Sequence, residues 1–480
     1  MTKKSIAKNY VFNLMYQILT MIIPLITTPY LSRVLGAENI GIYSYTLSIT
    51  TYFILFGSLG VAMYGQREIA YLQDKPKKRS KTFFEILLMR FITLGISLIV
   101  FYLSFCLHGQ YKMYYLILIL EIIANSLDIS WFFQGMEEFK KTVFRNTLVK
   151  LISVVCIFLF VKNNSDLNKY FMIYVFSNLL GNLTLWFYLP KYVEKVNMKS
   201  LNIFRHLKPT FFLFLPQIAT QIYTVLDKTM IGAIVFNKAE VGYYEQAQKI
   251  VKFLMTIATS LGTVMMPRIA YTYAKGDMEK LRYYMNKSFS FILILAFPLT
   301  FGIISIASKF VPLFYGPGFE KVTSLLIIIS PIIVFIGLSN VVGTQYLLPT
   351  KQQSKYTISV IIGAFVNLVM NFILIKNYKS IGASISTVFA ELSVTAIQFY
   401  LVRNQIKIID VFKIFYKYFI ASLIMCLISF IIGYFINSNI VSILIQFFIS
   451  VVSYFGLLVL MKDEFVFEVV NLFKKKLIRN

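Results

Sequence analysis

The chain has 480 residues, of which 58% are hydrophobic and only 14% are charged. Typical soluble domains carry about 25% charged residues, so the composition excludes a protein whose whole surface faces water. The formal net charge of +26 comes from 47 Lys and Arg against 21 Asp and Glu, but these cations lie between long apolar segments, which argues against a nucleic-acid-binding face.

A helix needs about 20 mostly apolar residues to cross a bilayer, and fourteen segments of the chain are candidates. They lie at 10–31, 42–63, 83–107, 111–133, 146–161, 170–190, 210–236, 243–267, 287–308, 322–348, 356–375, 380–401, 416–436 and 440–461. The first segment is longer than the apolar core of a cleavable signal peptide and lacks an Ala-x-Ala cleavage site. The links are too short to hold a soluble domain. The sequence therefore predicts an all-α integral membrane protein with about fourteen transmembrane helices.

The distribution of Lys and Arg over the links predicts the orientation. The two termini and the links that follow the even-numbered segments hold 31 basic residues, whereas the opposite set of links holds 8. We therefore expect the first set and both termini to lie in the cytoplasm.

A weak internal repeat suggests how the chain is organised. Asn39–Tyr43 reads NIGIY and Glu240–Tyr244 reads EVGYY, with their glycines 201 residues apart. Each copy would hold six spans. Because this number is even, the two copies would have the same orientation in the membrane and be related by an axis along the membrane normal. The predicted parts are an N-lobe at 1–209, a C-lobe at 210–415, two further spans at 416–461 and a basic cytoplasmic tail at 462–480. The tail is expected to be an amphipathic helix on the anionic inner leaflet, or else a disordered basic tail.

Ionisable side chains inside membrane helices are costly and are therefore candidates for function. Arg90 and Asp128 fall at a similar depth, roughly 10 Å from the cytoplasmic edge at a rise of 1.5 Å per residue, and could pair. Glu121, Asn125 and Asp128 share one inward face of their helix because they are spaced i, i+4, i+7. The alternative to a functional role for Arg90 and Asp128 is a buried ion pair that only fixes packing. Lys150 lies at a comparable depth and is a further candidate. Its alternative role is to extend its ammonium group to the inner membrane surface.

A second group lies in the outer half of the membrane. Asp227 and Lys228 are in the seventh span, and Lys249 and Lys252 enter the eighth span one turn apart. Glu245, four residues before Lys249, could neutralise that lysine. The group predicts a water-filled cationic cavity that binds an anion, with snorkelling to the outer interface as the alternative.

Four further residues complete the candidate site. Glu391 lies near the middle of the twelfth span with Gln398 two turns on, which indicates either a proton or cation site or a hydrogen-bonded neutral acid. Arg33, Arg67 and Arg268 lie at span ends, where anchoring is the ordinary role. Candidate substrate-binding residues are therefore Arg33, Arg67, Arg90, Lys150, Lys228, Lys249, Lys252 and Arg268, and candidate coupling or charge-balancing residues are Asp128, Asp227 and Glu391.

Several kinds of chemistry are not expected. Cys106, Cys156 and Cys426 lie inside apolar segments, which disfavours a disulfide framework or a metal cluster. His108 and His206 are too few and too far apart for a histidine-based catalytic or zinc site. No glycine is followed by lysine, so the chain lacks a nucleotide-binding P-loop. We expect no cofactor, no metal and no enzymatic activity, and a secondary transporter is the class that remains.

Motifs spread over most of the chain resemble one known family. They are PLITTPYLSRVLGAENIGIYSYTLSITTYFILFGSLG at 24–60, YGQREIAY at 64–71, FQGMEEFK at 133–140, PQIATQIYTVLDKTMIGA at 216–233, VGYYEQAQKI at 241–250, MMPRIA at 265–270, LFYGPGF at 313–319 and SIGAS at 380–384. They are similar to those of the polysaccharide repeat-unit (Wzx-type) flippases of the polysaccharide transporter family. These flippases belong to a larger superfamily, which also holds the multidrug/toxin extrusion antiporters and the peptidoglycan-precursor flippase.

The resemblance implies two six-helix lobes in a V around a central cationic cavity, plus two C-terminal helices, with alternating access to the two membrane faces. It implies a cargo of undecaprenyl-diphosphate-linked oligosaccharide, moved from the inner to the outer leaflet of the bacterial plasma membrane for export of capsule, O-antigen or exopolysaccharide. Membrane lipid and other membrane proteins of polysaccharide assembly are the further candidate partners, and nucleic acid is not. The residues that match family-typical polar positions are Arg33, Arg67, Asp227, Lys228 and Arg268.

Two rival functions remain open at this point. A cation- or proton-coupled drug antiporter of the same superfamily should carry more acidic than basic groups in its cavity, whereas the interior candidates here are mostly basic. A membrane polymerase of the same pathway would need a sizeable external loop with catalytic charges. The longest external link spans only 309–321.

Overall fold

The structure is a computed structural model that describes residues 6–260, 262–406 and 408–468. All regular secondary structure in these ranges is helical, as the sequence predicts. The helices up to the middle of the chain are α1 (Ile6–Ser58), α2 (Val61–Tyr71), α3 (Pro76–Phe101), η1 (Tyr102–Cys106), α4 (Lys112–Ser126), α5 (Ser130–Gly135), α6 (Phe139–Phe160), η2 (Asn164–Asp166), α7 (Leu167–Trp186), η3 (Leu189–Lys191), η4 (Met198–Ser200), η5 (Ile203–His206) and α8 (Leu207–Ile234). Those that follow are α9 (Ala239–Thr259), α10 (Gly262–Ala274), α11 (Met278–Tyr315), α12 (Lys321–Ile329), α13 (Ile332–Ser339), η6 (Asn340–Leu347), α14 (Gln353–Val402), α15 (Ile408–Phe435) and α16 (Asn439–Leu460).

The helices form two compact units. The first unit runs to Gly232 and also includes Asn237–Gly242, and the second holds Ala233–Phe236 and the chain from Tyr243 onward. The chain therefore leaves the first unit at the end of α8, returns to it, and leaves again at the start of α9. The lobe boundary between 209 and 210 that the sequence predicts stays a prediction.

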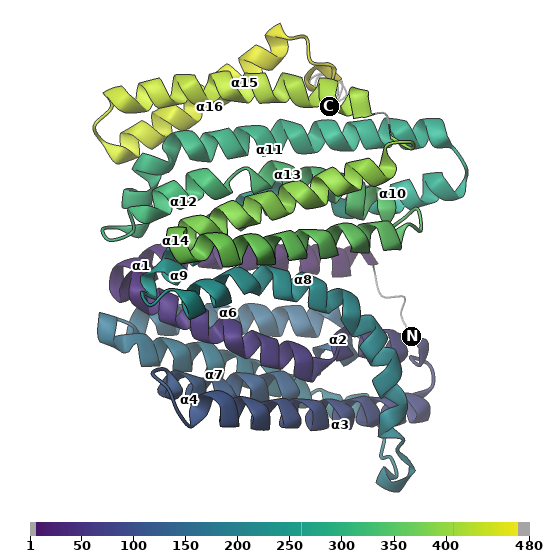
Figure 1. Cartoon of the computed structure of the whole chain (residues 1–480). Coiled ribbons are helices and arrows are strands. Elements are labelled where there is room, and N and C mark those ends of the chain that lie inside the picture. The colour runs from purple at the N-terminus through teal and green to yellow at the C-terminus, as the bar shows by residue number, and fades with distance from the viewer. Residues whose placement is uncertain (1–5, 261, 407, 469–480) are drawn as a thin grey trace. The chain divides into compact units, whose positions relative to one another are not determined.

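In the first unit α1 is the central element. It packs against α3, α4 and α6, while α4 and α6 both pack against α7 (Figure 1). The helix turns sharply at Gly36, whose φ of 73° and ψ of 172° are not helical. This positive φ is available to glycine at no steric cost. The turn separates the two spans that the sequence predicts at 10–31 and 42–63.

A close backbone contact holds the start of α9 against α1. A Cβ atom on Gly41 would lie 1.7 Å from the backbone oxygen of Lys238, and one on Gly242 would lie 2.1 Å from that of Ala37. Only glycine permits an approach of this kind. Gly41 and Gly242 are the equivalent positions of the predicted repeat, so the structure brings the two repeat-related glycines together.

The second unit is built around α11. This helix packs against α15 and α16, which lie along one side of it, and against α10, α12 and α13 (Figure 1). The 50-residue α14 reverses at Lys379, where φ is 53° and ψ is −128°. Its two arms pack closely at Gly363, because a Cβ there would lie 2.2 Å from the Val394 side chain.

The lengths of the helices fit a membrane protein. Nine helical segments of the described chain are long and apolar enough to span a membrane. Two of them, Ile22–Tyr71 and Gln353–Val402, have 50 residues each, which at 1.5 Å per residue is about twice the thickness of the hydrocarbon core. The predicted spans at 146–161, 210–236 and 243–267 coincide with α6, with α8 and with α9 plus the start of α10. The all-α membrane fold is confirmed, and the count of fourteen crossings stays a prediction.

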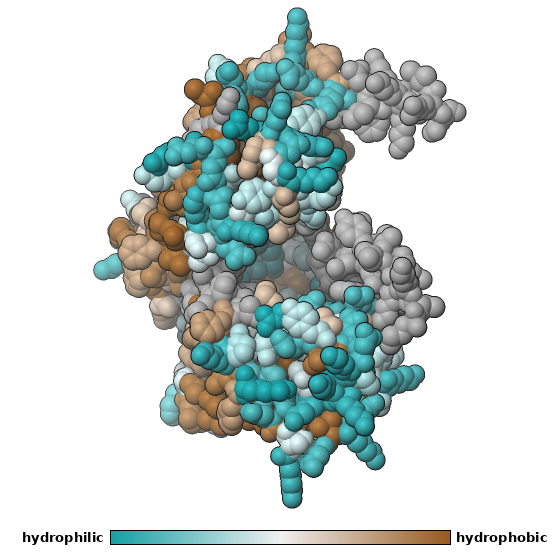
Figure 2. Space-filling model, turned by 90° about the vertical axis from the view of Figure 1, so that its right-hand side faces the viewer, coloured by the Kyte–Doolittle hydropathy of each residue, from teal (hydrophilic) through white to brown (hydrophobic). Residues whose placement is uncertain are grey.

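One end of the first unit is strongly polar. In the lower part of Figure 2, hydrophilic side chains cover the end of this unit where α3 begins and where the link from α7 to α8 lies. Exposed lysines there include Lys77, Lys78, Lys195 and Lys199. Basic links of this kind mark the cytoplasmic side of membrane proteins, so this end corresponds to the side that the sequence predicts to be cytoplasmic.

The tail of the chain begins with a short docked helix. Residues 464–468 are helical, and Asp463 caps them by accepting a hydrogen bond from the Val466 backbone at 3.1 Å. The Tyr418 hydroxyl donates to the same carboxylate at 3.3 Å, and Lys287 forms an ion pair with Glu468. The remainder of the predicted amphipathic tail, 469–480, lies outside the described residues.

Candidate functional site

The predicted site residues divide between the two units. Those in the first unit are Arg33, Arg67, Arg90, Asp128, Lys150, Asp227 and Lys228, and those in the second are Lys249, Lys252, Arg268 and Glu391. Each group is described within its own unit, and their assembly into a single cavity stays a prediction.

Two arginines of the first unit, Arg33 and Arg67, have local partners near the surface. The exposed Arg33 donates from Nη1 to the Pro29 carbonyl at 2.9 Å. Arg67 pairs with Glu68 at 3.0 Å and lies 5.4 Å from the ring centroid of Tyr64. These contacts fit the role of an anchor and equally leave the guanidinium groups within reach of an anionic ligand.

Arg268 is the corresponding residue of the second unit. It is exposed on α10, and its guanidinium carbon lies 4.6 Å from the ring centroid of Tyr284 on α11. A cation over an aromatic face is held electrostatically without losing its hydrogen-bond donors. The side chain is thus oriented by α11 while its donors stay available.

Arg90 differs from these because it is buried. Its side chain on α3 is only 3% exposed, and its Nε and Nη1 atoms have no hydrogen-bond partner among the described residues. Asp128 is the charge that acts on it. That carboxylate accepts a hydrogen bond from the Ser130 backbone at 2.9 Å, at the start of α5, and makes no direct ion pair with Arg90 in the described chain. A buried guanidinium with unused donors is costly unless an anion approaches it.

The lysines of the predicted cavity are less deeply placed. Lys150 on α6 and Lys228 on α8 are half-buried, and Lys252 on α9 is exposed. Lys249 forms an i, i+4 ion pair with Glu245 at 3.7 Å. The neutralising contact that the spacing predicts is therefore present, and it offsets part of the positive charge in the middle of α9.

Asp227 lies at a polar seam between α8 and α1. It is 3% exposed and acts electrostatically on the hydroxyl of Tyr52. The neighbouring Thr229 hydroxyl lies 3.0 Å from that of Ser48 and 3.4 Å from that of Tyr52. A buried carboxylate inside the membrane is costly, and the role of Asp227 in charge balance or coupling stays a prediction.

Lys238 lies in an aromatic cage that the sequence analysis did not identify. Its ammonium donates to the Gly232 carbonyl at 2.6 Å and lies 5.0 Å from the Tyr45 ring centroid and 6.0 Å from that of Tyr111. Burial lowers the pKa of this lysine. The cage fastens the link between α8 and α9 to α1 and to the start of α4.

Two stripes of polar side chains face each other between α4 and α7. Glu121 is 6% exposed, and Asn178 donates to both of its oxygens, at 3.1 and 3.0 Å. Asn125 adds a weaker contact at 3.4 Å. The inward face of α4 that the spacing predicts is thus confirmed for Glu121 and Asn125, whereas Asp128 lies beyond the end of α4 at Ser126. The sequence analysis assigned no role to Glu121. The signal for its partner was the four-residue spacing of Tyr170, Tyr174, Asn178 and Asn182.

The second unit has a polar interior of its own. Gln248 donates to the Tyr244 hydroxyl at 2.9 Å, and that hydroxyl lies 2.9 Å from that of Thr387. Glu391 on the same arm of α14 is 8% exposed and acts electrostatically on Tyr356. Glu391 is therefore buried on the same arm of α14 as Thr387, and its role as a proton or cation site stays a prediction.

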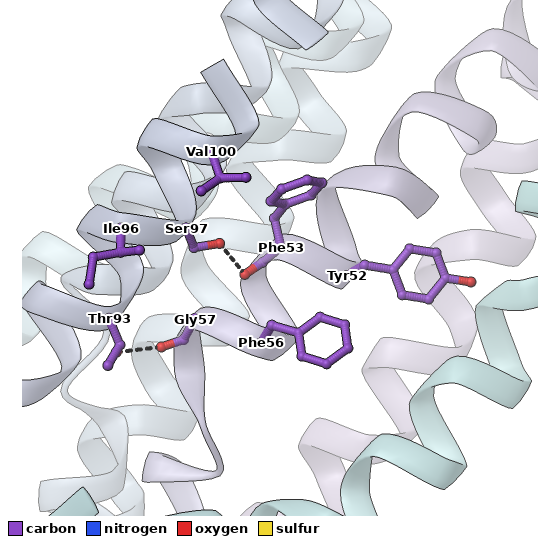
Figure 3. Close-up of a pocket in the computed structure, with 8 residues that line it drawn as sticks. All are labelled: Tyr52, Phe53, Phe56, Gly57, Thr93, Ile96, Ser97 and Val100. Carbon is purple, nitrogen blue, oxygen red and sulfur yellow. Dashed lines mark hydrogen bonds between the residues drawn. The ribbon is translucent and has the colours of Figure 1, made fainter. Parts of the chain in front are cut away.

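A groove of about 360 Å³ between α1 and α3 has a different character. It is lined by Tyr52, Phe53, Phe56, Gly57, Thr93, Ile96, Ser97 and Val100. Figure 3 shows two of its three hydroxyls donating to the α1 backbone, Thr93 to Gly57 and Ser97 to Phe53, each at 2.6 Å. The ring of Tyr52 points away from the α3 side chains. With its hydroxyls occupied, the groove presents hydrocarbon and fits lipid rather than an anion.

A buried polar cluster docks the link between α7 and α8 onto the first unit. Glu85 is fully buried, accepts from the Asn202 backbone at 2.8 Å, and contacts Arg205 and the His206 Nε2 atom, the latter at 3.0 Å. The other ring nitrogen lies 2.7 Å from the Tyr64 hydroxyl. Burial is the main influence on His206 and lowers its pKa. Its role is structural.

Comparisons with known families cover both halves of the chain. The model of a family described as "Polysaccharide biosynthesis protein" matches residues 6–273. A second model, described as "Lipid II flippase MurJ", matches residues 151–455.

Individual relatives align over nearly their whole lengths. A protein of Escherichia coli (strain K12) that carries the name of an O-antigen transporter is 26% identical over 408 residues, which cover 84% of this chain and 98% of the relative. The capsular polysaccharide biosynthesis protein CapF of Staphylococcus aureus is 23% identical, and the alignment covers 83% of this chain and 99% of the length of CapF.

Solved structures share the fold. The lipid II flippase MurJ in an inward closed conformation has a TM-score of 0.78 at 19% identity and covers 94% of this chain and 99% of its own. An inward-facing multidrug resistance transporter of the MATE family has a TM-score of 0.58 at 12% identity, over 80% of this chain and 98% of its own.

Proposed function

The chain belongs to the polysaccharide biosynthesis protein family, and from this premise we propose that it is a flippase for lipid-linked oligosaccharides that works by alternating access. One observation carries the proposal. The alignments with an O-antigen transporter and a capsular polysaccharide protein cover 98% and 99% of those relatives. The whole transport unit, and not one shared segment, is therefore common to them.

The physical problem that such a protein solves is the cost of moving sugar through hydrocarbon. Each polar group left unsatisfied there costs several kcal/mol. Polar and charged side chains inside the helices, among them Arg90, Asp227, Glu121 and Glu391, can replace water around the sugar. The lipid tail meanwhile stays in the bilayer, against apolar surfaces such as the groove between α1 and α3.

The proposed cargo is an undecaprenyl-diphosphate-linked repeat unit, carried from the inner to the outer leaflet for capsule, O-antigen or exopolysaccharide. The basic candidates, from Arg33 to Arg268, are proposed to bind the diphosphate. Arg90 is the strongest of them because its Nε and Nη1 donors are buried and have no hydrogen-bond partner in the described chain. Outward movement of each negative charge across an inside-negative potential is favourable by about 2.3 kcal/mol per 100 mV.

The location and orientation belong to the same proposal. The protein is a multi-pass membrane protein, and we place it in the bacterial plasma membrane with both termini in the cytoplasm, on the asymmetry of basic residues over the links. The two lobes at 1–209 and 210–415 would move against each other, with 416–461 attached to the second. Partners beyond the lipid-linked cargo and membrane lipid would be other membrane proteins of polysaccharide assembly.

Reconstituted protein tests the function directly. Purified protein in liposomes should expose a labelled undecaprenyl-diphosphate oligosaccharide on the far leaflet without ATP, and an inside-negative potential should speed the movement. Arg90→Gln should slow it, because the donors at that position lose their charge. Exposed Lys77→Gln, also on α3, is the matched control and should transport normally.

Two outcomes would refute the proposal. Rates equal to those of protein-free liposomes would mean that the chain does not move this cargo. Transport of cationic dyes in place of the lipid-linked glycan would assign the chain to the cation- or proton-coupled drug antiporters, the alternative that the fold likeness to the MATE transporter supports.

A further inference from the structure

The carboxylate of Glu121 is buried in the first unit without a cation. It is 6% exposed, and the groups that contact it are the amides of Asn178 and Asn125. No lysine or arginine of the described chain pairs with it or acts on it electrostatically. An ionised carboxylate in an apolar interior is strongly disfavoured when no cation balances it. The geometry therefore favours a group that carries a proton for part of the time.

A chain of hydroxyl groups leads away from this carboxylate. The hydroxyl of Tyr174 interacts with Asn178 and with Tyr43, and that of Tyr43 with Tyr170. The Tyr43 ring centroid lies 5.6 Å from that of Tyr174 and 4.7 Å from that of Tyr170. The chain thus crosses from α7 to α1 and back to α7.

The chain of hydroxyls ends at one face of the unit. Tyr170 is the fourth residue of α7, directly after η2, and its side chain is partly exposed. Beside it the Asn39 amide donates to the Asn164 backbone oxygen at 2.8 Å. This face is the one that the basic-residue asymmetry predicts to be external. Hydroxyl groups both donate and accept hydrogen bonds, so the chain can pass protons between water at that face and Tyr174, which Asn178 separates from Glu121.

The arrangement favours a proton over a metal cation. Both carboxylate oxygens already accept hydrogens from the Asn178 amide, which directs the positive end of that dipole at the place where a metal would bind. Metal ions such as Na⁺ or Ca²⁺ are held instead by several oxygens that converge on one point. A proton needs only one free lone pair of the carboxylate.

The surroundings of Glu121 contain few other ionisable groups. Tyr43 of α1 and Tyr174 of α7 act on it electrostatically, while Arg90 of α3 acts with Asp128 at the far end of α4. On α6, Arg145 donates to Asn182, one turn beyond Asn178, at 3.1 Å. Protonation of Glu121 is thus the main change of charge that this packing layer can undergo.

We propose that Glu121 is the proton-binding site of the first unit and that Tyr174, Tyr43 and Tyr170 connect it to water. The proton comes from hydronium on the external face and moves along the hydroxyls to Tyr174. It passes from Tyr174 to a carboxylate oxygen of Glu121 when the Asn178 amide between them turns aside, and it returns to water in the other state of the transport cycle. No bond other than O–H forms or breaks. The coupling to transport rests on the proposed flippase function, but the binding of the proton does not.

Infrared spectroscopy tests the site independently of transport. In purified protein, the C=O stretch of a protonated carboxyl group should be present at neutral pH, should shift on deuteration, and should disappear as the pH rises. Glu121→Gln should remove the part of this band that Glu121 contributes. Glu279→Gln, at the exposed start of α11, should leave it unchanged. A spectrum in which Glu121→Gln retains the whole band overturns the proposal.

Transport in liposomes tests the coupling. An imposed pH gradient should change the rate of glycan movement in the wild type, and Glu121→Gln should lose this response. Tyr174→Phe, which keeps the ring and removes the hydroxyl, should retain the infrared band but respond less to the gradient. Elution of each variant as a single species in detergent controls for folding.

The outcomes separate this proposal from the flippase function. If no glycan moves but the band depends on Glu121, the proton site stands and the cargo assignment fails. If glycan moves, and neither the band nor the gradient response depends on Glu121, the proton site is wrong and the flippase function stands. A response to a sodium gradient alone that Glu121→Gln abolishes would replace the proton with Na⁺ and refute the proposal.

Discussion

The glycine at position 41 provides a sharp test of the packing, because two physical effects oppose each other there. By helix propensity alone, Gly41→Ala should stabilise α1 by up to about 1 kcal/mol. The new Cβ, however, would lie 1.7 Å from the Lys238 backbone oxygen, whereas an ordinary contact of carbon with oxygen needs about 3.3 Å. The two backbones would have to separate by roughly 1.6 Å. Overpacking of this kind costs about 3 kcal/mol, so we expect a net loss near 2 kcal/mol.

Thermal unfolding in detergent measures this loss. The native thiols Cys106 and Cys426 are buried, so a thiol-reactive dye reports their exposure as the protein unfolds. Gly95→Ala is the matched control, since a Cβ at Gly95 of α3 would meet nothing within 4 Å, and that variant should be as stable as the wild type or slightly more so. If Gly41→Ala is as stable as Gly95→Ala, the close contact between α1 and the start of α9 is wrong.

Three further predictions follow from other parts of the chain. A cysteine at Lys78 should be shielded from an impermeant thiol reagent in intact cells while one at Asn164 is labelled, and labelling at Lys78 would reverse the orientation. Lys252→Glu should impair glycan movement more than Lys252→Gln if the residue lines an anion path, whereas a fully active Lys252→Glu protein would make it an anchor. Burial lowers the pKa of His206 in the docked link. As the pH falls through about 6.5, the ordinary pKa of histidine, His206 therefore takes up a proton more readily when the link is undocked than when it is docked. The docking of residues 198–206 should therefore weaken as the pH falls through that value, and hydrogen exchange, corrected for its intrinsic pH dependence, should rise there; constant protection would count against the role of burial.

The sequence was sufficient to predict the helices, because a membrane helix needs only a long apolar segment. It also predicted which residues share a face along one helix. The stripe of Glu121 and Asn125 on α4 and the ion pair of Glu245 with Lys249 on α9 follow from the four-residue spacing alone. These features depend on the geometry of a single helix and need no knowledge of its neighbours.

Contacts between helices were harder to predict. Depth in the membrane places Arg90 and Asp128 at one level, but it does not say in which direction around the helix axis each side chain points. In the structure Asp128 binds the start of α5, and Arg90 stays buried without that direct pair. The hydroxyl chain of Tyr43 and Tyr174 likewise requires α1 and α7 to be neighbours, which no pattern along either helix specifies.

The contact of Gly41 with Gly242 also has a consequence for synthesis. The two glycines are 201 residues apart in the sequence, and ribosomes add roughly 5–20 residues per second. Gly41 is therefore made about 10–40 s before its partner, on the same rates. During that interval the first unit lacks the segment Asn237–Gly242, which belongs to it. The ribosome must therefore reach α9, most of which belongs to the second unit, before the first unit is complete. The last step in assembling the first unit thus coincides with the start of synthesis of the second.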